Sequence, residues 1–349
     1  MRSENGHSES VTIKRVAERA GVSAATAARA MGKYGSVSEK TRRRVLDAAR
    51  ELSYVPNAIA KSMRVQRTRT IGAIIGDIQA PFFSKLAFAI EDFANRRGYN
   101  VLVCNTNEKP ERELRHLQSL FERRVDGIIL SSTQRFNSEM GQDIRRLYES
   151  EIPLVTVDRQ VNGLKRPLVQ CNNLGGSYQA GKYLLELGHR NIGVIASNQF
   201  VNSTREREAG FRMALAEYNL TLRPGMIRYC EESFITEAGR RITKDLLDDN
   251  PDITALYLLN NPLYRSAWLE LKARGARIPE DISLLGWGDV ELAEAWDITA
   301  VTQPIQNIGI RAAEILFDMI DNRTRHEDDV VVFDTAIVYR SSCAKPRVG

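Results

Sequence analysis

The first 70 residues carry polar and basic side chains at a spacing that suits DNA recognition. Thr26 and Arg29 lie one helical turn apart within Ala24–Met31, so both can reach base edges or phosphates. Residues 1–70 contain 15 Lys and Arg against 6 Asp and Glu, whereas the whole chain has 49 against 44. The excess positive charge is therefore concentrated where phosphates would have to be neutralised. For Arg42–Arg44 alone, a solvated basic helix face is the alternative.

Three helices are predicted to position these side chains. Each is preceded by a hydroxyl residue that can cap it: Ile13–Ala20 after Thr12, Ala24–Met31 after Ser23, and Glu39–Leu52 after Ser38. Gly21 allows a tight turn between the first two helices, because glycine adopts positive φ at low cost. A helix, a glycine turn and a capped second helix predict a helix-turn-helix unit, whose second helix enters the major groove.

The order of these segments resembles the headpiece of the LacI/GalR (lactose repressor) family of bacterial transcription regulators. The matching segments are Thr12–Lys14 with Val16–Ala17, Ala20–Ser23, Thr26, Arg29, Val37–Arg42 and Tyr54–Ala58. The resemblance implies a homodimer that binds a palindrome in double-stranded operator DNA. The residues that it places at the DNA are Thr12, Ser23, Ala24, Ala25, Thr26, Arg29, Ser38, Thr41, Asn57, Ala60 and Met63.

Two features of this region depart from the family pattern. Met63 stands where a leucine is usual in the hinge helix, which would insert an apolar side chain into the minor groove. The segment 56–70 is the predicted hinge helix and linker, and a plain linker is the alternative. The recognition helix offers Ala24, Ala25, Ala27 and Ala28 where polar residues often read bases. We expect specificity to depend more on Met63 and on DNA shape.

From Ile71 onward, strands rich in Ile, Val and Leu alternate with helical segments, which predicts parallel sheets covered on both faces. The expected strands are Ile71–Gly76, Val101–Asn105, Gly127–Leu130, Pro153–Val157, Ile192–Ala196, Met226–Tyr229, Thr254–Leu259 and Ile282–Gly286. This number exceeds one typical open sheet, so two Rossmann-like lobes with a cleft between them fit better.

Several function classes find no support in the residues. No G-x-G-x-x-G motif, P-loop, nucleophile elbow or H-E-x-x-H motif is present, so we expect neither an enzyme nor a cofactor. The four Cys and four His are scattered, and no metal site is expected. Apolar residues make up 43% of the chain, without a run long enough to span a membrane. The polar first ten residues lack a signal-peptide core, and a cytoplasmic protein is expected.

The region after residue 70 resembles the family's sensor domain, which is similar to periplasmic sugar-binding proteins. Markers include Ala80–Phe83, Val125–Leu130, Asp158–Arg159, Leu187–Ile192, Arg207 before Gly210–Phe211, Ile278–Ser283 and Thr302–Pro304. The predicted organisation is a disordered tail at 1–11, the helix-turn-helix domain at 12–55, the hinge and linker at 56–70, and an effector-binding domain at 71–349. Its N-lobe covers about 71–168 and 303–332, and its C-lobe about 169–301 and 333–349, with crossings near Val169, Thr302 and Phe333.

The resemblance also implies an effector pocket with aromatic walls and polar groups at strand ends. The candidates are Phe82, Phe83, Asp158, Arg207, Phe234, Asn260 and Asp289. Arg207 is expected to bind the effector as a forked donor, and a surface salt bridge with Glu206 or Glu208 is the alternative. Asp158 would accept hydrogen bonds, or else cap the next turn. One of Phe82 and Phe83 is expected to face the cleft and the other to belong to the core.

Two pocket positions depart from the family pattern, because Gly288 and Asn261 stand where acidic residues are common. The pocket therefore carries less negative charge at these two positions than the family pattern would give it. This difference favours an anionic effector, a sugar acid or phosphorylated sugar, over a neutral sugar. The chain is therefore predicted to be an allosteric regulator, more specifically a repressor, of carbohydrate catabolic genes. A regulator that responds to a partner protein or compulsory corepressor remains the alternative, and a periplasmic-type binding protein or an enzyme is a remote one.

Overall fold

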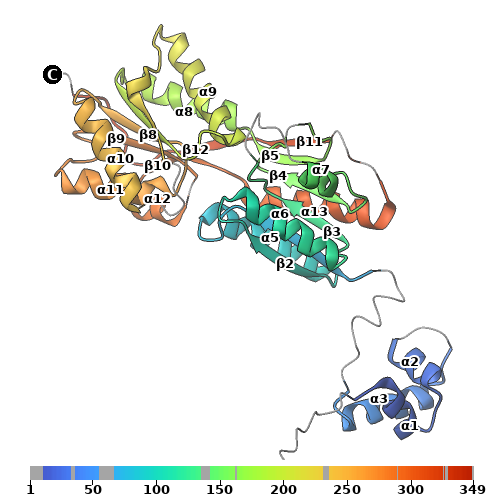
Figure 1. Ribbon diagram of the computed structural model, residues 1–349. Coiled ribbons are helices and arrows are strands. Elements are labelled where there is room, and N and C mark those ends of the chain that lie inside the picture. Colours follow the sequence, from blue (N-terminus) through green and yellow to red (C-terminus); the bar gives the residue numbers. More distant parts are fainter. Residues whose placement is uncertain are drawn as a thin grey trace, which may run out of the picture. The chain divides into compact units, whose positions relative to one another are not determined.

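The computed structural model describes residues 11–32, 36–54, 67–134, 142–161, 163–230, 236–288, 290–324, 326 and 329–347. The chain divides into two compact units, Met1–Thr68 and Arg69–Gly349. We call the first the headpiece and the second the two-lobed unit, and each is described by itself (Figure 1). Residues 1–10 and most of the segment 56–70, which were predicted as tail and hinge, lie outside the described residues.

The headpiece contains the three helices that the sequence predicts: α1 (Ile13–Ala20), α2 (Ala24–Gly32) and α3 (Glu39–Glu51). Its small core is built mainly from alanine and valine: Val16, Ala17, Ala20, Ala27, Ala30, Val45, Ala48 and Ala49. Side chains of this size allow the three helices to approach each other closely, so a short segment can still bury a continuous apolar interior.

Two of the three predicted helix caps form. The Ser38 hydroxyl accepts a hydrogen bond from the Thr41 amide at 3.3 Å, and the Ser23 hydroxyl accepts one from the Thr26 amide at 3.1 Å. Thr12 occupies the N-cap position of α1, but its side chain makes no capping hydrogen bond, so that prediction is wrong. Gly21 has φ of 63° and ends α1 in the left-handed conformation, as expected.

The first lobe of the two-lobed unit is a six-stranded parallel sheet in the order β11-β5-β4-β3-β1-β2. Its strands are β1 (Thr70–Ile75), β2 (Asn100–Asn105), β3 (Gly127–Leu130), β4 (Leu154–Val157), β5 (Leu168–Cys171) and β11 (Val330–Phe333). Its helices are α5 (Pro81–Arg96), α6 (Pro110–Glu122), α7 (Gln142–Tyr148) and α13 (Ile305–Asn322). Helices α5 and α13 pack against each other and against the sheet, while α6 contacts α7 and β1.

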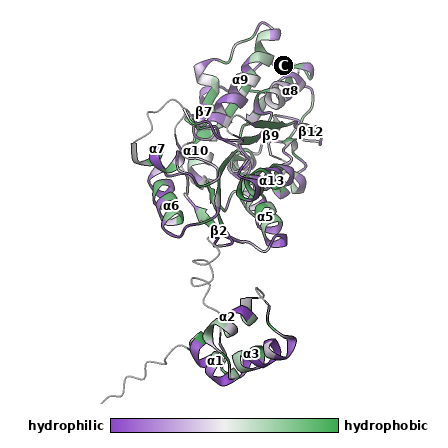
Figure 2. Cartoon of the chain, turned by 90° about the vertical axis from the view of Figure 1, so that its right-hand side faces the viewer, coloured by the Kyte–Doolittle hydropathy of each residue, from purple (hydrophilic) through white to green (hydrophobic). Residues whose placement is uncertain are grey.

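The second lobe is also a six-stranded sheet, in the order β12-β10-β9-β8-β6-β7, and only β12 runs antiparallel. Its strands are β6 (Ile192–Ala196), β7 (Ile227–Tyr229), β8 (Ala255–Leu258), β9 (Ser283–Trp287), β10 (Thr299–Thr302) and β12 (Ala336–Val338). Its helices are α8 (Asn173–Glu186), α9 (Asn202–Glu217), η1 (Pro224–Met226), α10 (Thr236–Asp249), α11 (Leu263–Ala273) and α12 (Glu291–Ala295). Figure 2 shows hydrophobic colour along the strands and hydrophilic colour on the outer helix faces.

The chain passes from one sheet to the other three times, after Cys171, after Thr302 and after Phe333. The predicted parallel two-lobed fold is therefore confirmed. The sequence did not predict β5, β10, β11, β12 or α12, each of which spans only three to five residues. Short length alone is not the reason, because β3, β4 and β7 are equally short and were predicted. Within the described ranges, no helix has the length and apolar character needed to cross a membrane.

Gly210 provides a test of the second lobe, because α9 lies against α8 at this residue. A Cβ atom at position 210 would lie 2.1 Å from the Leu174 carbonyl oxygen, which is backbone and cannot rotate away. We expect Gly210→Ala to lower the free energy of unfolding of the two-lobed unit by about 1–3 kcal/mol or more in denaturant titration. Gly225→Ala is the control, since its Cβ would meet Asn250 only at 3.8 Å. Equal stability of both variants would contradict the close α8–α9 contact.

Candidate DNA-binding surface and ligand cleft

Helix α2 presents a short polar patch between small side chains. Ala24, Ala25 and Arg29 are exposed and Thr26 is half-buried. Arg29 lies along the helix, where its Nε donates to the Ala25 carbonyl at 3.3 Å and its Nη2 donates to the Thr26 hydroxyl at 3.4 Å. Ala27 is fully buried in the headpiece core, so its side chain cannot contact bases. Among the α2 residues predicted to contact DNA, only Thr26 and Arg29 have side chains that can form hydrogen bonds with bases.

The three consecutive arginines of α3 have different roles. Arg42 donates to the Ala30 carbonyl at 3.0 Å, and Arg44 donates to the Ala20 carbonyl. These bonds satisfy carbonyl groups near the C-terminal ends of α2 and α1, where basic side chains are also favoured by the helix dipole. The Arg43 side chain is 77% exposed. Two of the three therefore hold the headpiece together, which the sequence did not reveal.

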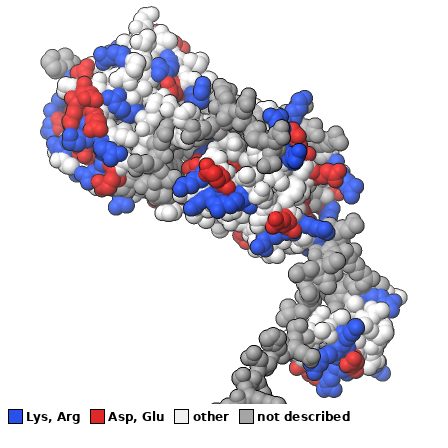
Figure 3. Space-filling model, viewed as in Figure 1, with Lys and Arg blue, Asp and Glu red and all other residues white. Residues whose placement is uncertain are grey.

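The remaining predicted DNA contacts are hydroxyl groups at helix starts. Ser23 and Ser38 are exposed, and their hydroxyls lie 2.9 Å from those of Thr26 and Thr41, respectively. Thr12 is also exposed. The face of the headpiece in Figure 3 shows basic side chains with a few acidic ones among them. Asn57, Ala60 and Met63 lie outside the described residues, and their roles stay predictions.

In the first lobe, charged side chains gather where parallel strands end. Asp77 follows β1, Glu108 follows β2, and Asp158 and Arg159 follow β4. The carboxyl ends of parallel strands share one sheet edge, which is where such folds bind ligands. Arg159 donates two hydrogen bonds to the Glu108 carboxylate, at 2.7 and 2.9 Å. Glu108 and Asp158 have φ of 58° and 64°, a conformation that costs energy outside glycine and is frequent at functional sites.

Arg207 connects the two lobes at this edge. Arg207 belongs to α9, and the residue is 5% exposed. It donates to Asn173 Oδ1 and to the Leu259 carbonyl, both at 2.9 Å, and these two groups belong to the second lobe. Its Nη2 lies 4.0 Å from Asp158 Oδ1 of the first lobe, and its guanidinium stacks 4.4 Å from the Trp287 ring. A buried guanidinium that reaches across the lobes fits a ligand-binding role better than a surface salt bridge.

The acidic neighbours considered as alternatives for Arg207 have other partners. Glu206 accepts hydrogen bonds from Asn173 at 3.0 Å and from Asn202 at 2.8 Å, while Glu208 pairs with Arg212 at 2.7 Å. Burial raises the pKa of the Glu206 carboxyl. Burial likewise raises the pKa of Asp77, and the charge of Glu108 adds to that shift. Buried or half-buried carboxylates therefore lie near this edge in both lobes.

Both aromatic residues at the start of α5 are buried in the core, and which of them faces a ligand stays a prediction. Phe82 and Phe83 are 8% and 5% exposed, and their rings meet edge to face at 5.1 Å. The Arg159 guanidinium lies 5.4 Å from the centre of the Phe83 ring, so Phe83 is the one that borders the charged cluster. Asn260 is half-buried, and its Oδ1 accepts from the Ser197 amide at 2.9 Å. Phe234 and Asp289 lie outside the described residues.

The structure adds cleft residues that we did not predict: Glu108, Arg159, Asn173 and Trp287. Arg159 follows a candidate in the sequence, and Trp287 ends a buried strand, so strand-end position was the available signal. No local pattern pointed to Glu108 or Asn173. Gly288, with φ of 94°, is required by its surroundings, because a Cβ there would lie 2.8 Å from Asn261 Nδ2. Asn261 therefore fills space that a side chain at 288 would need.

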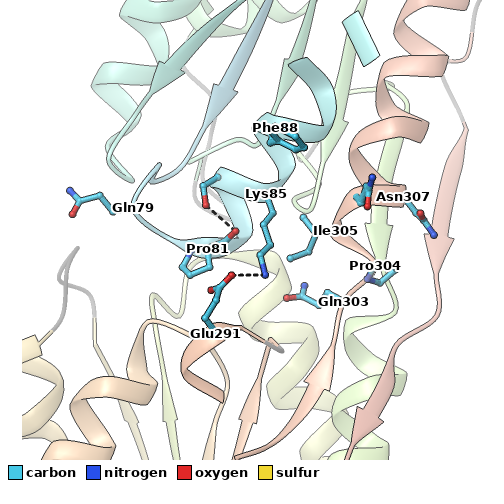
Figure 4. Close-up of a pocket in the computed structure, with 11 residues that line it drawn as sticks. Gln79, Pro81, Lys85, Phe88, Glu291, Gln303, Pro304, Ile305 and Asn307 are labelled. Carbon is cyan, nitrogen blue, oxygen red and sulfur yellow. Dashed lines mark hydrogen bonds and ion pairs between the residues drawn. The ribbon is translucent and has the colours of Figure 1, made fainter. Parts of the chain in front are cut away.

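A hollow with a volume of about 670 Å³ lies beside the start of α5 and the start of α13 (Figure 4). It is lined by Gln79, Pro81, Ser84, Lys85, Phe88, Glu291, Gln303, Pro304, Ile305, Gln306 and Asn307. Lys85 of α5 and Glu291 of α12 bridge the lobes there at 3.1 Å. None of the predicted effector residues is among those that line this hollow.

Comparison with known proteins places both parts of the chain in one family. Residues 12–57 match the model of bacterial regulatory proteins of the lacI family, and residues 68–338 match the model of periplasmic binding proteins and the sugar-binding domain of the LacI family. The chain is 31% identical over 333 residues to the HTH-type transcriptional repressor PurR of Pasteurella multocida, covering 95% of this chain and 98% of that one. PurR of Aliivibrio fischeri is 33% identical over 337 residues, with the same shares covered.

Solved structures support the same assignment. A complex of the transcriptional regulator CelR with cellobiose superimposes with a TM-score of 0.70 at 27% identity, over 95% of this chain and 99% of that one. The lac repressor dimer bound to operator and the anti-inducer ONPF has a TM-score of 0.83 at 22% identity, over 96% and 100%, and it shows the shared fold. The curated relatives are transcriptional repressors and not enzymes. The chain belongs to the lacI family of bacterial regulatory proteins and is a DNA-binding transcriptional repressor of that family.

Proposed function

We propose that the protein acts in the cytoplasm as a homodimer, that two headpieces bind one palindromic operator, and that a small molecule between the lobes changes this binding. The observation that carries the proposal is the buried Arg207, which is held by the second lobe and faces Asp158 of the first. A molecule bound at this contact would favour one angle between the lobes over another. Such a ligand shifts the equilibrium by its difference in affinity for the two states.

For DNA binding, the proposal rests on the exposed residues of α2. It also rests on the family resemblance, in which the segment after the headpiece forms a hinge helix that contacts the minor groove. Thr26 and Arg29 would contact base edges or phosphates, and Ala24 and Ala25 would contact thymine methyl groups. Thr12, Ser23, Ser38 and Thr41 would position the headpiece on phosphates. Asn57, Ala60 and Met63 would form the hinge contact in the minor groove, with Met63 as the wedge.

On the ligand side, we propose a carbohydrate as the first candidate. The match to a sugar-binding domain and the likeness to a regulator solved with cellobiose support this choice. Phe83, Asp158, Arg207 and Asn260 would line the pocket, with Phe234 and Asp289 as further contacts. A planar nitrogen heterocycle is the second candidate, because the aromatic side chains of Phe83 and Trp287 belong to the same cluster as the two guanidinium groups.

The proposal is tested by selecting bound duplexes from a random DNA library with the full-length protein. We expect an enriched palindrome with a deformable step at its centre. The enriched duplex is then used in fluorescence anisotropy with a panel of neutral sugars, sugar phosphates and purine bases. A bound sequence without two-fold symmetry would contradict the dimeric operator, and a partner protein or corepressor would become the leading input if no small molecule changed the affinity.

Arg29→Ala is expected to weaken operator binding by about 1–3 kcal/mol, because it removes the forked donor on the exposed face of α2. Anisotropy titrations on the selected duplex and on a scrambled duplex measure the loss. The matched control is Arg50→Ala, which removes the same charge from α3, where the Arg50 side chain is 78% exposed and pairs with Asp47. Equal weakening by both substitutions would mean that Arg29 contributes only general attraction to phosphates.

Arg207→Ala is expected to abolish the response to any small molecule that changes operator affinity in the unaltered protein, while basal operator binding persists. The guanidinium is the group that meets both lobes, so its loss uncouples the ligand from the lobe angle. Thermal unfolding is measured in parallel, because the substitution leaves Asp158 without one of its two cations. A folded variant that keeps its normal ligand response would exclude Arg207 from the pocket.

A further inference from the structure

Exposed arginines gather at the edge of the first sheet where the strands begin. Residues of β1 pair in register with the first residues of β2 and of β3, so these three strands start side by side. The segments that lead into them are Arg69 before β1, the C-terminal end of α5 before β2 and the C-terminal end of α6 before β3. We call this group the basic edge, and its members are Arg69, Arg96, Arg97, Arg123, Arg124 and Arg323.

Arg323, which follows α13, belongs to the same edge although α13 leads into a more distant strand. The Arg97 Nη1 lies 3.6 Å from Asp321 Oδ2 in the last turn of α13. The Arg97 guanidinium carbon also lies 5.1 Å from the centres of the Phe93 and Phe317 rings, which belong to α5 and α13. These contacts hold the C-terminal ends of the two helices together.

Three members of the basic edge have no acidic partner. Arg96 and Arg97 are each paired with an aspartate. By contrast, among the residues that the structure describes, no carboxylate oxygen lies within 4.0 Å of the guanidinium groups of Arg69, Arg123 or Arg323. Their positive charges are therefore available to a partner from outside the chain.

The overall composition does not account for this concentration of positive charge. Residues 69–349 contain 35 Lys and Arg against 38 Asp and Glu, so the two-lobed unit as a whole is slightly acidic. The opposite edge of the same sheet carries the carboxylates that follow β1, β2 and β4. The helix dipole favours basic residues at helix C-termini, which accounts in part for Arg123 and Arg323, but Arg69 directly precedes a strand.

The polypeptide that carries the headpiece enters the two-lobed unit at this edge, because Arg69 is the first residue of the unit. Arg69 lies 15 residues after Tyr54, the last described residue before the linker. A chain of that length spans roughly 50 Å at most. DNA held by the headpiece is thus kept within reach of the basic edge, and a short tether makes a second contact effectively intramolecular, at roughly millimolar effective concentration.

We infer that the basic edge binds the sugar-phosphate backbone of the same duplex that the headpiece recognises, through Arg69, Arg123 and Arg323. Exposed guanidinium groups suit this partner, because they form forked hydrogen bonds with phosphate oxygens and release condensed cations from DNA. Contacts of this kind carry no sequence information, so they add affinity and salt dependence without changing the operator. The surface is distinct from the proposed contacts of the headpiece and of the hinge segment.

The test compares the salt dependence of operator binding by the full-length protein and by Arg123→Gln/Arg323→Gln. Anisotropy titrations on the selected duplex are repeated between about 50 and 200 mM salt, and the logarithm of the binding constant is plotted against the logarithm of the salt concentration. The matched control is Arg223→Gln/Arg265→Gln, which removes two exposed positive charges from the second lobe. Thermal unfolding is measured for every variant.

We expect the double variant to reduce the magnitude of the slope by about 1 or more and to weaken binding about tenfold at low salt, because each lost phosphate contact removes about 0.9 from the slope. The control should keep the slope of the unaltered protein. An unchanged slope in the folded double variant, or an equal fall in the control, would overturn the inference. Each single variant, Arg123→Gln and Arg323→Gln, is titrated as well, so that one unfolded protein does not decide the outcome.

Photochemical cross-linking tests the contact directly. A benzophenone amino acid in place of Arg123 or of Arg323 should cross-link the full-length protein to the labelled duplex, and the same group at position 223 or 265 should not. Position 25 on the exposed face of α2 is the positive control, so a failure of the headpiece to bind DNA is seen separately. Cross-linking at position 25 but at neither position of the basic edge would overturn the inference, as would equal cross-linking at positions 223 and 265.

Discussion

The buried guanidinium of Arg207 is the constraint on which the two-lobed unit depends. A cation this deeply buried costs several kcal/mol unless its hydrogen bonds and its charge are compensated. Asn173 and the Leu259 carbonyl provide the hydrogen bonds, and Asp158 provides the opposite charge from the other lobe. The second lobe therefore fixes the position of the Arg207 side chain. The positive charge of Arg207 then favours the arrangement in which Asp158 of the first lobe lies beside it. A ligand bound here, as we propose, would act on the same interactions that hold the lobes together.

Parallel topology explains why so many charged groups meet at this edge. The strands β1, β2 and β4 all end on the same side of the first sheet, and each is followed by a charged residue. Two of these residues, Glu108 and Asp158, adopt positive φ, so backbone strain accompanies the placement of their carboxylates. Charged groups from three strands therefore meet at one edge of the sheet, although they are far apart in the sequence.

The stability of the headpiece is limited by its very small core. Its helices bury mainly alanine and valine, so few apolar atoms are available to hold it together. Arg42 and Arg44 compensate by binding carbonyl groups near the ends of two helices. Residues that look like a basic DNA-binding cluster in the sequence therefore serve partly to join the helices, which leaves Arg29 and Thr26 as the polar groups of α2.

The sequence alone determined the local features of this protein. The helix-turn-helix could be predicted from apolar periodicity, from the hydroxyl caps at Ser23 and Ser38, and from Gly21. The two parallel sheets could be predicted from the alternation of apolar strands with helices. Only the tertiary structure placed Ala27 in the core and assembled the cleft, because the partners there are distant in the chain. Arg159 and Glu108 are 51 residues apart, and Arg207 and Leu259 are 52 apart. Charge balance between such residues depends on which strand ends meet in space, and no local pattern encodes that.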